Sequence, residues 1–208
     1  MLIASAKPKS STPPLEAGSY PARCVQVIDI GDQMNDLSGK LQREVMILFE
    51  IPSERINVNG EDKPRIMKEI YTLSLTDKAN LRKALESWRG KQFTDEELDA
   101  FDIRKILNTT CILSVVEKTS KTSGNKYSKI GSISRCMKGI VVPPAESPVF
   151  AFDLDEPDAL GTLETLPEWV QKYVKQGQTY KDMISNPKNF DDISSDDLPF
   201  GDEPPLDD

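Results

Sequence analysis

The alternation of apolar and polar side chains predicts three β-strands in the first third of the chain. Residues 43–52 (REVMILFEIP) give the clearest strand, because every second side chain is apolar and these side chains share one face. Residues 20–30 (YPARCVQVIDI) and 65–75 (RIMKEIYTLSL) are rich in β-branched and aromatic residues and predict two further strands. The shared apolar face of the clearest strand consists of Val45, Ile47, Phe49 and Ile51.

The spacing of apolar residues then changes to that of a helix. Residues 77–90 predict a helix in which Asp77 is suited to the N-cap and Gly90 to the position where the helix ends. Thr94, followed three residues later by Glu97, matches a capping box and predicts a second, short helix. The apolar positions at helical spacing in the first helix are Leu81, Ala84, Leu85 and Trp88.

Strand patterns resume at residues 109–119 and 127–136, on either side of the turn SKTSGNK. The predicted order is therefore three strands, a helix and two strands. This order is typical of the OB-fold, a five-stranded Greek-key barrel that binds oligonucleotides, although other α+β domains share it. We predict a mainly β fold, with an OB-fold over residues 18–141 and a flexible N-terminal arm over residues 1–17.

The C-terminal third differs in composition. Residues 142–190 are rich in proline and acidic residues, which predicts a linker or strap lying on the barrel. Within it, LPEWVQKYVKQ predicts a helical extension with Pro167 in the first turn. Its apolar stripe is expected to dock on the body or on a second subunit, so a homo-oligomer stays open. The stripe consists of Trp169, Val170, Tyr173 and Val174.

Residues 191–208 contain eight acidic residues and no basic residue. Such a segment cannot bury enough apolar surface to offset the entropy lost on ordering, and we predict a disordered acidic tail. The tail either keeps the protein soluble or serves as a binding site for partner proteins, with Phe200 as an apolar anchor.

The chain lacks several groups that enzymes commonly need. It has no histidine, which excludes the commonest general base and the commonest transition-metal ligand. The three cysteines, Cys24, Cys111 and Cys136, are far apart, form no CxxC pair and are expected to be reduced thiols. We expect no catalytic residue, no metal and no cofactor. No apolar run reaches the roughly 20 residues that a membrane helix needs, and we expect a cytoplasmic protein.

Charge is unevenly distributed along the chain. Residues 18–141 contain 20 Lys and Arg against 17 Asp and Glu, whereas residues 142–208 contain 4 against 16. A mildly basic body is therefore joined to a strongly acidic C-terminal part. The acidic overall charge of −8 does not exclude a nucleic-acid surface on the body.

The last predicted hairpin carries the clearest basic cluster. Tyr127 is surrounded by lysines, an arrangement that suits phosphate contacts and base stacking on single-stranded nucleic acid. By alternation along the fifth strand, one face is shared by Tyr127, Lys129, Gly131, Ile133 and Arg135, and this face suits a bound strand of nucleic acid. The lysines of this hairpin are Lys118, Lys121, Lys126 and Lys129.

Residues on the other strands complete the candidate DNA-binding surface. Lys68 and Tyr71 lie on opposite faces of the third strand, so only one of them can face a bound strand. The candidate phosphate contacts from the first two strands and their loop are Arg23, Lys40 and Arg43. The remaining large aromatic residues of the body, Phe49 and Trp88, are expected in the core.

The segment DDLPF resembles the acidic tip of bacterial single-stranded DNA-binding proteins, in which the tip recruits replication, recombination and repair enzymes. By this resemblance the partner-binding residues are Asp196, Asp197, Leu198, Pro199 and Phe200. The sequences YTLSLTDKANLRKALESWRGK and REVMILFEIP resemble a family of phage-encoded proteins associated with DNA replication and recombination. This chain departs from the bacterial family because GDEPPLDD follows Phe200.

These patterns together predict a non-enzymatic, phage-encoded protein that binds single-stranded DNA without sequence specificity in the host cytoplasm. Its tail would recruit replication or recombination proteins. The alternative is an interaction protein whose acidic part mimics DNA and inhibits a basic nucleic-acid enzyme. An endonuclease is a third alternative, and it would need a metal held by a carboxylate cluster.

Overall fold

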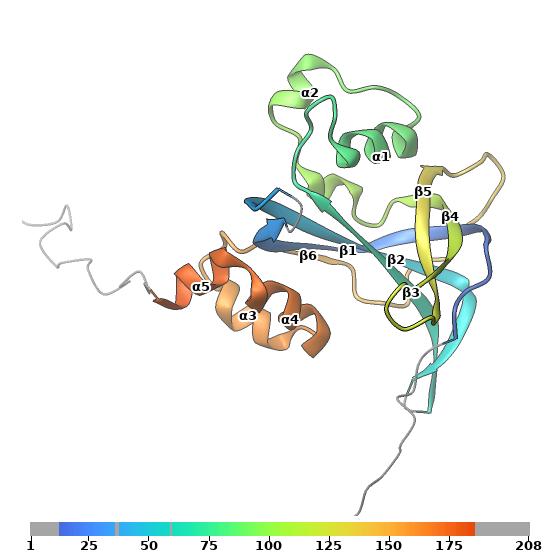
Figure 1. Ribbon diagram of the computed structural model, residues 1–208. Helices are drawn as coiled ribbons and strands as arrows, with labels where there is room; N and C mark the ends of the chain where they lie inside the picture. Colours follow the sequence, from blue (N-terminus) through green and yellow to red (C-terminus); the bar gives the residue numbers. More distant parts are fainter. Residues whose placement is uncertain (1–12, 36–37, 59, 186–208) are drawn as a thin grey trace, which may run out of the picture.

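The computed structural model describes residues 13–35, 38–58 and 60–185 (Figure 1). The predicted disordered tail, together with its five partner-binding residues Asp196 to Phe200, lies outside the described residues. No helix in the described part of the chain is long and apolar enough to span a membrane.

Five long strands form the body of the protein: β1 (Gly18–Asn35), β2 (Lys40–Val58), β3 (Glu61–Thr72), β4 (Thr110–Thr119) and β5 (Lys126–Arg135). They are antiparallel in the order β3-β2-β1-β4-β5, and the short strand β6 (Phe150–Phe152) pairs parallel with β1. Helices α1 (Asn80–Arg89) and α2 (Asp95–Asp99) and the 3₁₀ helix η1 (Ile103–Ile106) lie between β3 and β4. The predicted mainly β, OB-like fold with a helix between the third and fourth strands is confirmed.

The inner core lies between the strands and α1. Phe49 is fully buried, and its ring lies 5.5 Å from that of Trp88. The buried residues of α1 are Leu81, Leu85 and Trp88. The helix therefore packs on the strands with the apolar face that the spacing of these residues in the sequence predicted. The prediction that Phe49 and Trp88 are core residues is confirmed.

The signals for the first two helices are confirmed except for one, and Pro167, predicted in the first turn of the third helix, is the N-cap before Glu168. Gly90 ends α1 in the left-handed conformation, with φ at 67°. Thr94 and Glu97 form both hydrogen bonds of a capping box at the start of α2. Asp77 is not the N-cap, because α1 begins after Ala79 and the Asp77 carboxylate instead pairs with Arg82.

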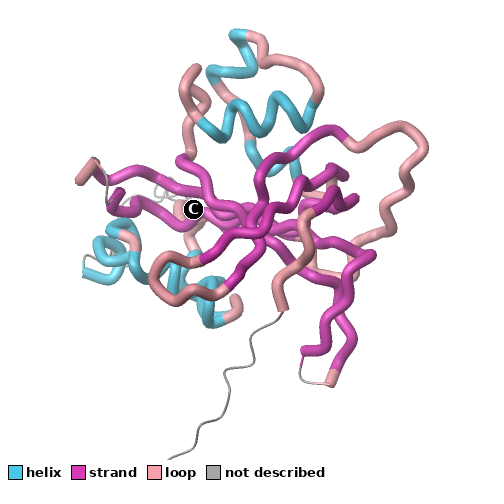
Figure 2. Tube along the Cα trace, turned by 45° about the vertical axis from the view of Figure 1, so that its right-hand side comes forward, coloured by secondary structure: helices cyan, strands magenta, loops and turns pink. Residues whose placement is uncertain are grey.

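The outer face of β1 and β2 is buried by the C-terminal residues. Helices α3 (Ala159–Thr165), α4 (Glu168–Gln176) and α5 (Gln178–Ser185) form one group, separated by the strands from α1 and α2 (Figures 1 and 2). Burial on both faces explains why both strands contain near-continuous apolar runs. The second core consists of Val25, Ile28, Ile30, Met46, Leu48, Phe152, Leu154, Ala159, Leu163, Leu166, Val170 and Val174. The predicted strap is thus a packed helical layer, and the stripe of α4 docks on the body.

Two acidic side chains fix this layer to the strands. Glu50 is completely buried and accepts hydrogen bonds from the backbone amides of Glu146, at 3.0 Å, and Ser147, at 2.8 Å. Asp29, also buried, pairs with Arg43 and accepts a hydrogen bond from the amide of Leu154. Because buried carboxylates need hydrogen-bond donors, these contacts hold residues 146–154 against the body.

The segment before β1 packs on the body. Residues 1–17 were expected to form a flexible arm, and the structure describes residues 13–17 of it. Leu15 is buried in the inner core, and its backbone amide donates to the hydroxyl of Ser128, which donates back to the carbonyl oxygen of Leu15. The described part of the expected arm is therefore anchored to β5.

Candidate nucleic-acid interface

A groove of about 680 Å³ lies between β3 and β5, the two strands at the ends of the sheet. Across the described residues, no backbone ladder joins these two strands, and side chains bridge them instead. Lys129 on β5 pairs with Glu69 on β3 at 3.4 Å. The carbonyl oxygen of Pro13 accepts a hydrogen bond from Arg65 on β3, so residues 13–15 connect both sides of the groove.

The groove is lined by more basic than acidic side chains. Its basic residues are Arg65, Lys68, Lys126 and Lys129, and its acidic residue is Glu69. Burial raises the pKa of the Glu69 carboxyl, and the charge of Lys129 only partly opposes this effect. A hydrogen bond to Glu117, at 2.8 Å, raises the pKa of Lys126, which therefore stays protonated at neutral pH. The groove thus keeps an excess of positive charge.

Aromatic rings lie in and beside the groove. Tyr127 lines it and is 46% exposed, so this side chain is open to solvent. The ammonium group of Lys68 lies 3.7 Å from the centroid of the Tyr173 ring and 4.9 Å from that of Trp169. These cation–π contacts connect the edge of the groove to α4, where Trp169 is 42% exposed.

The β4–β5 hairpin carries two further predicted lysines. Lys118 is the cross-strand neighbour of Tyr127 in the β4–β5 ladder, and Lys121 lies in the turn of the hairpin. Both side chains are exposed. The structure therefore brings together six of the predicted residues, of which Lys68, Lys126, Tyr127 and Lys129 line the groove and Lys118 and Lys121 lie on the adjoining hairpin.

Two predicted phosphate contacts are engaged elsewhere. The guanidinium group of Arg23 donates to the backbone carbonyl oxygens of Asn108, Val142 and Pro143 and to the side chain of Asn108. Arg43 pairs with Asp29 and, at 2.8 Å, with Asp155, and these contacts raise its pKa further. Both arginines fasten the C-terminal residues to the strands.

Two other predicted residues lie away from the groove. Tyr71 packs against the inner core, where burial raises the pKa of its phenol, whereas Lys68 lines the groove and contacts the rings of α4. This confirms that the two side chains point to opposite faces. Lys40 is exposed at the start of β2.

The prediction of a shared face along all of β5 is wrong. Ile133 is buried in the inner core together with Ile130, three residues earlier, because a β-bulge at Gly131 changes the phase of the strand. The regular alternation of Tyr127 and Lys129 therefore does not continue to Arg135. That arginine lines a separate hollow under α1.

The sequence reasoning missed four residues at or beside the groove. Arg65 and Glu69 are ordinary polar positions in the sequence of β3. No local pattern shows that these positions lie opposite β5. Trp169 and Tyr173 were recognised as part of a helical stripe. Their contact with Lys68 depends on how α4 docks, which the stripe alone does not specify.

A basic groove with an exposed ring is the arrangement that binds unpaired nucleic acid without sequence specificity. Cations contact successive phosphates, and rings stack on bases of any type. Comparison with protein-family models, with curated proteins and with solved structures gave no match.

Proposed function

We propose that this protein binds single-stranded DNA, without sequence specificity, in the groove between β3 and β5. The observation that carries the proposal is the presence of Lys68, Lys126, Lys129 and the exposed ring of Tyr127 in one groove. The lysines neutralise phosphates and the tyrosine stacks on a base.

Counterion release supplies most of the binding free energy in this mechanism. Each phosphate that a lysine neutralises on a single strand lowers the slope of log K against log salt concentration by about 0.7. Three lysines in the groove therefore give a slope of about −2, before the hairpin lysines are counted. Affinity falls steeply with salt, as expected for a protein that coats many different sequences.

Duplex DNA is a poorer ligand for this groove. Its bases are paired and stacked on one another, so the ring of Tyr127 has no free base to contact. Stacking contributes about 1–3 kcal/mol per base, which corresponds to roughly 5- to 150-fold in affinity. The protein should therefore prefer single strands to duplex of the same length.

The biological role follows from the sequence resemblances. We propose that the protein protects single-stranded intermediates in phage DNA replication and recombination. Its acidic C-terminal residues recruit partner enzymes, with Asp196, Asp197, Leu198, Pro199 and Phe200 as contacts.

Fluorescence anisotropy with a labelled oligothymidine, and with a duplex of equal length, tests the proposal. Tyr127→Ala is expected to weaken binding by about 1–3 kcal/mol, whereas Tyr127→Phe, which keeps the ring, retains it. The double variant Lys126→Ala, Lys129→Ala is expected to flatten the salt slope by about 1.4. The matched control is Lys78→Ala, Lys83→Ala, which removes two exposed lysines outside the groove.

The test also separates the alternative function. If the protein mimics DNA through its acidic C-terminal part, the groove variants leave all activity unchanged and oligothymidine does not bind. Equal affinity for the single strand and the duplex would likewise overturn the proposal. Residues 142–208 contain 16 acidic against 4 basic residues. This strong negative charge is the observation that favours the DNA-mimic alternative.

A further inference from the structure

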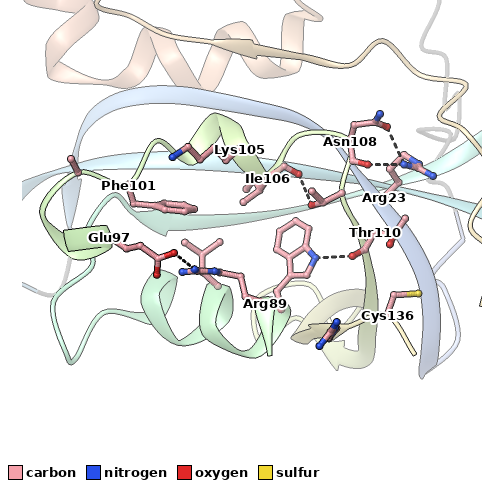
Figure 3. Close-up of a pocket in the computed structure, with 14 residues that line it drawn as sticks. Arg23, Arg89, Glu97, Phe101, Lys105, Ile106, Asn108, Thr110 and Cys136 are labelled. Atoms are coloured by element: carbon pink, nitrogen blue, oxygen red, sulfur yellow. Dashed lines mark hydrogen bonds and ion pairs between the residues drawn. The ribbon is translucent and has the colours of Figure 1, made fainter. Parts of the chain in front are cut away.

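A second basic hollow, of about 760 Å³, lies under α1 (Figure 3). Its walls come from α1, α2, η1 and the adjoining ends of β4 and β5. Arg135 lines it, whereas Tyr127 and Lys129, on the same strand, line the groove described above. The hollow is therefore separate from the proposed DNA-binding groove, and its ligand can bind whether or not the groove holds DNA.

The lining of the hollow carries a net positive charge. Four basic side chains, Arg23, Arg89, Lys105 and Arg135, face one carboxylate, that of Glu97. The hydrogen bond from Arg89 lowers the pKa of Glu97, which therefore stays ionised. Hence the lining has a formal charge of about +3 at neutral pH, which favours a ligand with more than one negative charge.

The basic residues of the hollow differ in how their donors are used. Arg23 has its guanidinium group engaged by carbonyl oxygens and by Asn108, and it fixes the wall near η1. Lys105 and Arg135 are exposed, and neither side chain has a hydrogen bond or ion pair within the described residues. Their donors are therefore available to an anion that enters the hollow.

Arg89 contributes positive charge to the wall of the hollow. Its guanidinium group pairs with Glu97 through Nη2 (Figure 3) and lies 4.2 Å from the centroid of the Phe93 ring. Its Nη1 atom is buried and has no hydrogen-bond partner among the described residues. Because that atom is closed off from solvent, an entering ligand reaches Lys105 and Arg135 first. A phosphoryl group presents several acceptor oxygens, and their geometry matches the guanidinium fork of Arg135.

The rest of the lining suits a flat, apolar group. Leu85, Trp88, Phe101 and Ile106 provide apolar surface, and the Trp88 ring is held by a hydrogen bond of 2.8 Å from its Nε1 to the carbonyl oxygen of Thr110. Pockets of about 300–1,000 Å³ with apolar walls and a few convergent polar groups bind small organic ligands. A nucleotide combines a flat ring with a phosphate of nearly two negative charges.

We propose that this hollow binds a nucleotide phosphomonoester, either as a free nucleotide or as the phosphorylated end of a nucleic-acid strand. The phosphate contacts Lys105 and Arg135, and the base lies against the apolar wall of the hollow, which includes Phe101.

The fluorescence of Trp88 reports on this site directly. The chain has two tryptophans, so in the Trp169→Phe variant the signal comes from Trp88 alone. Titration of this variant with thymidine 5′-monophosphate is expected to give a saturable change, whereas thymidine, which lacks the phosphate, binds at least about ten-fold more weakly. Arg135→Ala and Lys105→Ala are each expected to weaken nucleotide binding by about ten-fold or more. Lys83→Ala, on the exposed face of α1, is the control.

The two sources of the phosphate are separated with oligothymidines that carry a 5′-phosphate or a 5′-hydroxyl group. Tighter binding of the phosphorylated strand, lost in Arg135→Ala, identifies the strand end as the ligand. Equal binding of the two strands, together with saturable binding of the mononucleotide, identifies the free nucleotide. The absence of saturable nucleotide binding, or an Arg135→Ala variant that binds normally, overturns the inference. The proposed DNA-binding function fails separately, because its own test is the loss of oligothymidine binding in Lys126→Ala, Lys129→Ala.

Discussion

Glu69 is the acidic residue that lines the groove. If DNA phosphates bind in this groove, replacing Glu69 with glutamine should increase the affinity of the protein for single-stranded DNA. The substitution keeps the size of the side chain and removes the charge that lies 3.4 Å from the ammonium group of Lys129. A phosphate then no longer competes with Glu69 for Lys129. A gain of affinity cannot arise from misfolding, so the result is easy to interpret.

The size of the effect follows from the geometry. A phosphate oxygen bound to Lys129 at about 2.8 Å would lie about 6–7 Å from the Glu69 carboxylate. Two unit charges at about 7 Å interact by about 0.6 kcal/mol in water and about 2.4 kcal/mol at an effective dielectric constant of 20. Lys129 is 50% exposed, which places the effect in the lower part of this range. We expect Glu69→Gln to bind oligothymidine about 3- to 10-fold more tightly.

The salt and pH dependence of the variant provide two further measurements. Because Lys129 is already counted among the three lysines that contact phosphates, the slope of log K against log salt concentration should stay near about −2. Because burial raises the pKa of Glu69, folding favours its protonated form, and the stability that this residue contributes is lost as pH rises through its folded-state pKa. The glutamine variant is therefore expected to be the more stable protein at neutral pH, with the difference vanishing in acid.

The assay is anisotropy of labelled oligothymidine at low and physiological salt, with thermal unfolding measured across the pH range. Glu96→Gln, an exposed carboxylate on α2, is the control for a change in overall charge. If Glu69→Gln folds normally and its affinity is unchanged or weaker, phosphates do not follow the groove between β3 and β5.

Two further predictions concern the C-terminal residues. Leu163→Ala removes a fully buried side chain of α3 and is expected to lower the free energy of unfolding by about 2–5 kcal/mol, measured by urea denaturation. Unchanged stability would mean that the helical layer does not fold cooperatively with the strands. Removal of residues 191–208 deletes eight carboxylates that can compete with phosphates for basic side chains, so anisotropy should show tighter binding of oligothymidine. Weaker binding by the truncated protein would refute this competition.

Much of the fold could be predicted from local sequence patterns. The alternation in residues 43–52 identified the inner face of β2, with Phe49 in the core, because a strand face is set by a period of two. The capping box of Thr94 and Glu97 was predicted correctly because both hydrogen bonds form within four residues. The helical stripe of α4 was likewise a local signal.

The candidate site could be predicted only in part. The lysines of the β4–β5 hairpin and Tyr127 are close in sequence and stay close in the structure. Arg23 and Arg43, by contrast, each have a partner more than 80 residues away, in addition to Asp29 for Arg43, and no local pattern shows which basic side chains have such partners. The bulge at Gly131 shifted the face of Arg135, because one additional residue reverses the alternation.

The sequence by itself determined the five long strands, helices α1, α2 and α4, the basic hairpin and the segregation of charge, because each depends on a local pattern along the chain. Only the tertiary structure decided that β3 and β5 border one groove and that α3 to α5 cover the outer face of β1 and β2. These arrangements depend on contacts between distant segments, such as Lys129 with Glu69 and Glu50 with the amide of Ser147. The free energy of such contacts depends on where the folded chain brings their atoms, and a linear pattern does not contain that information.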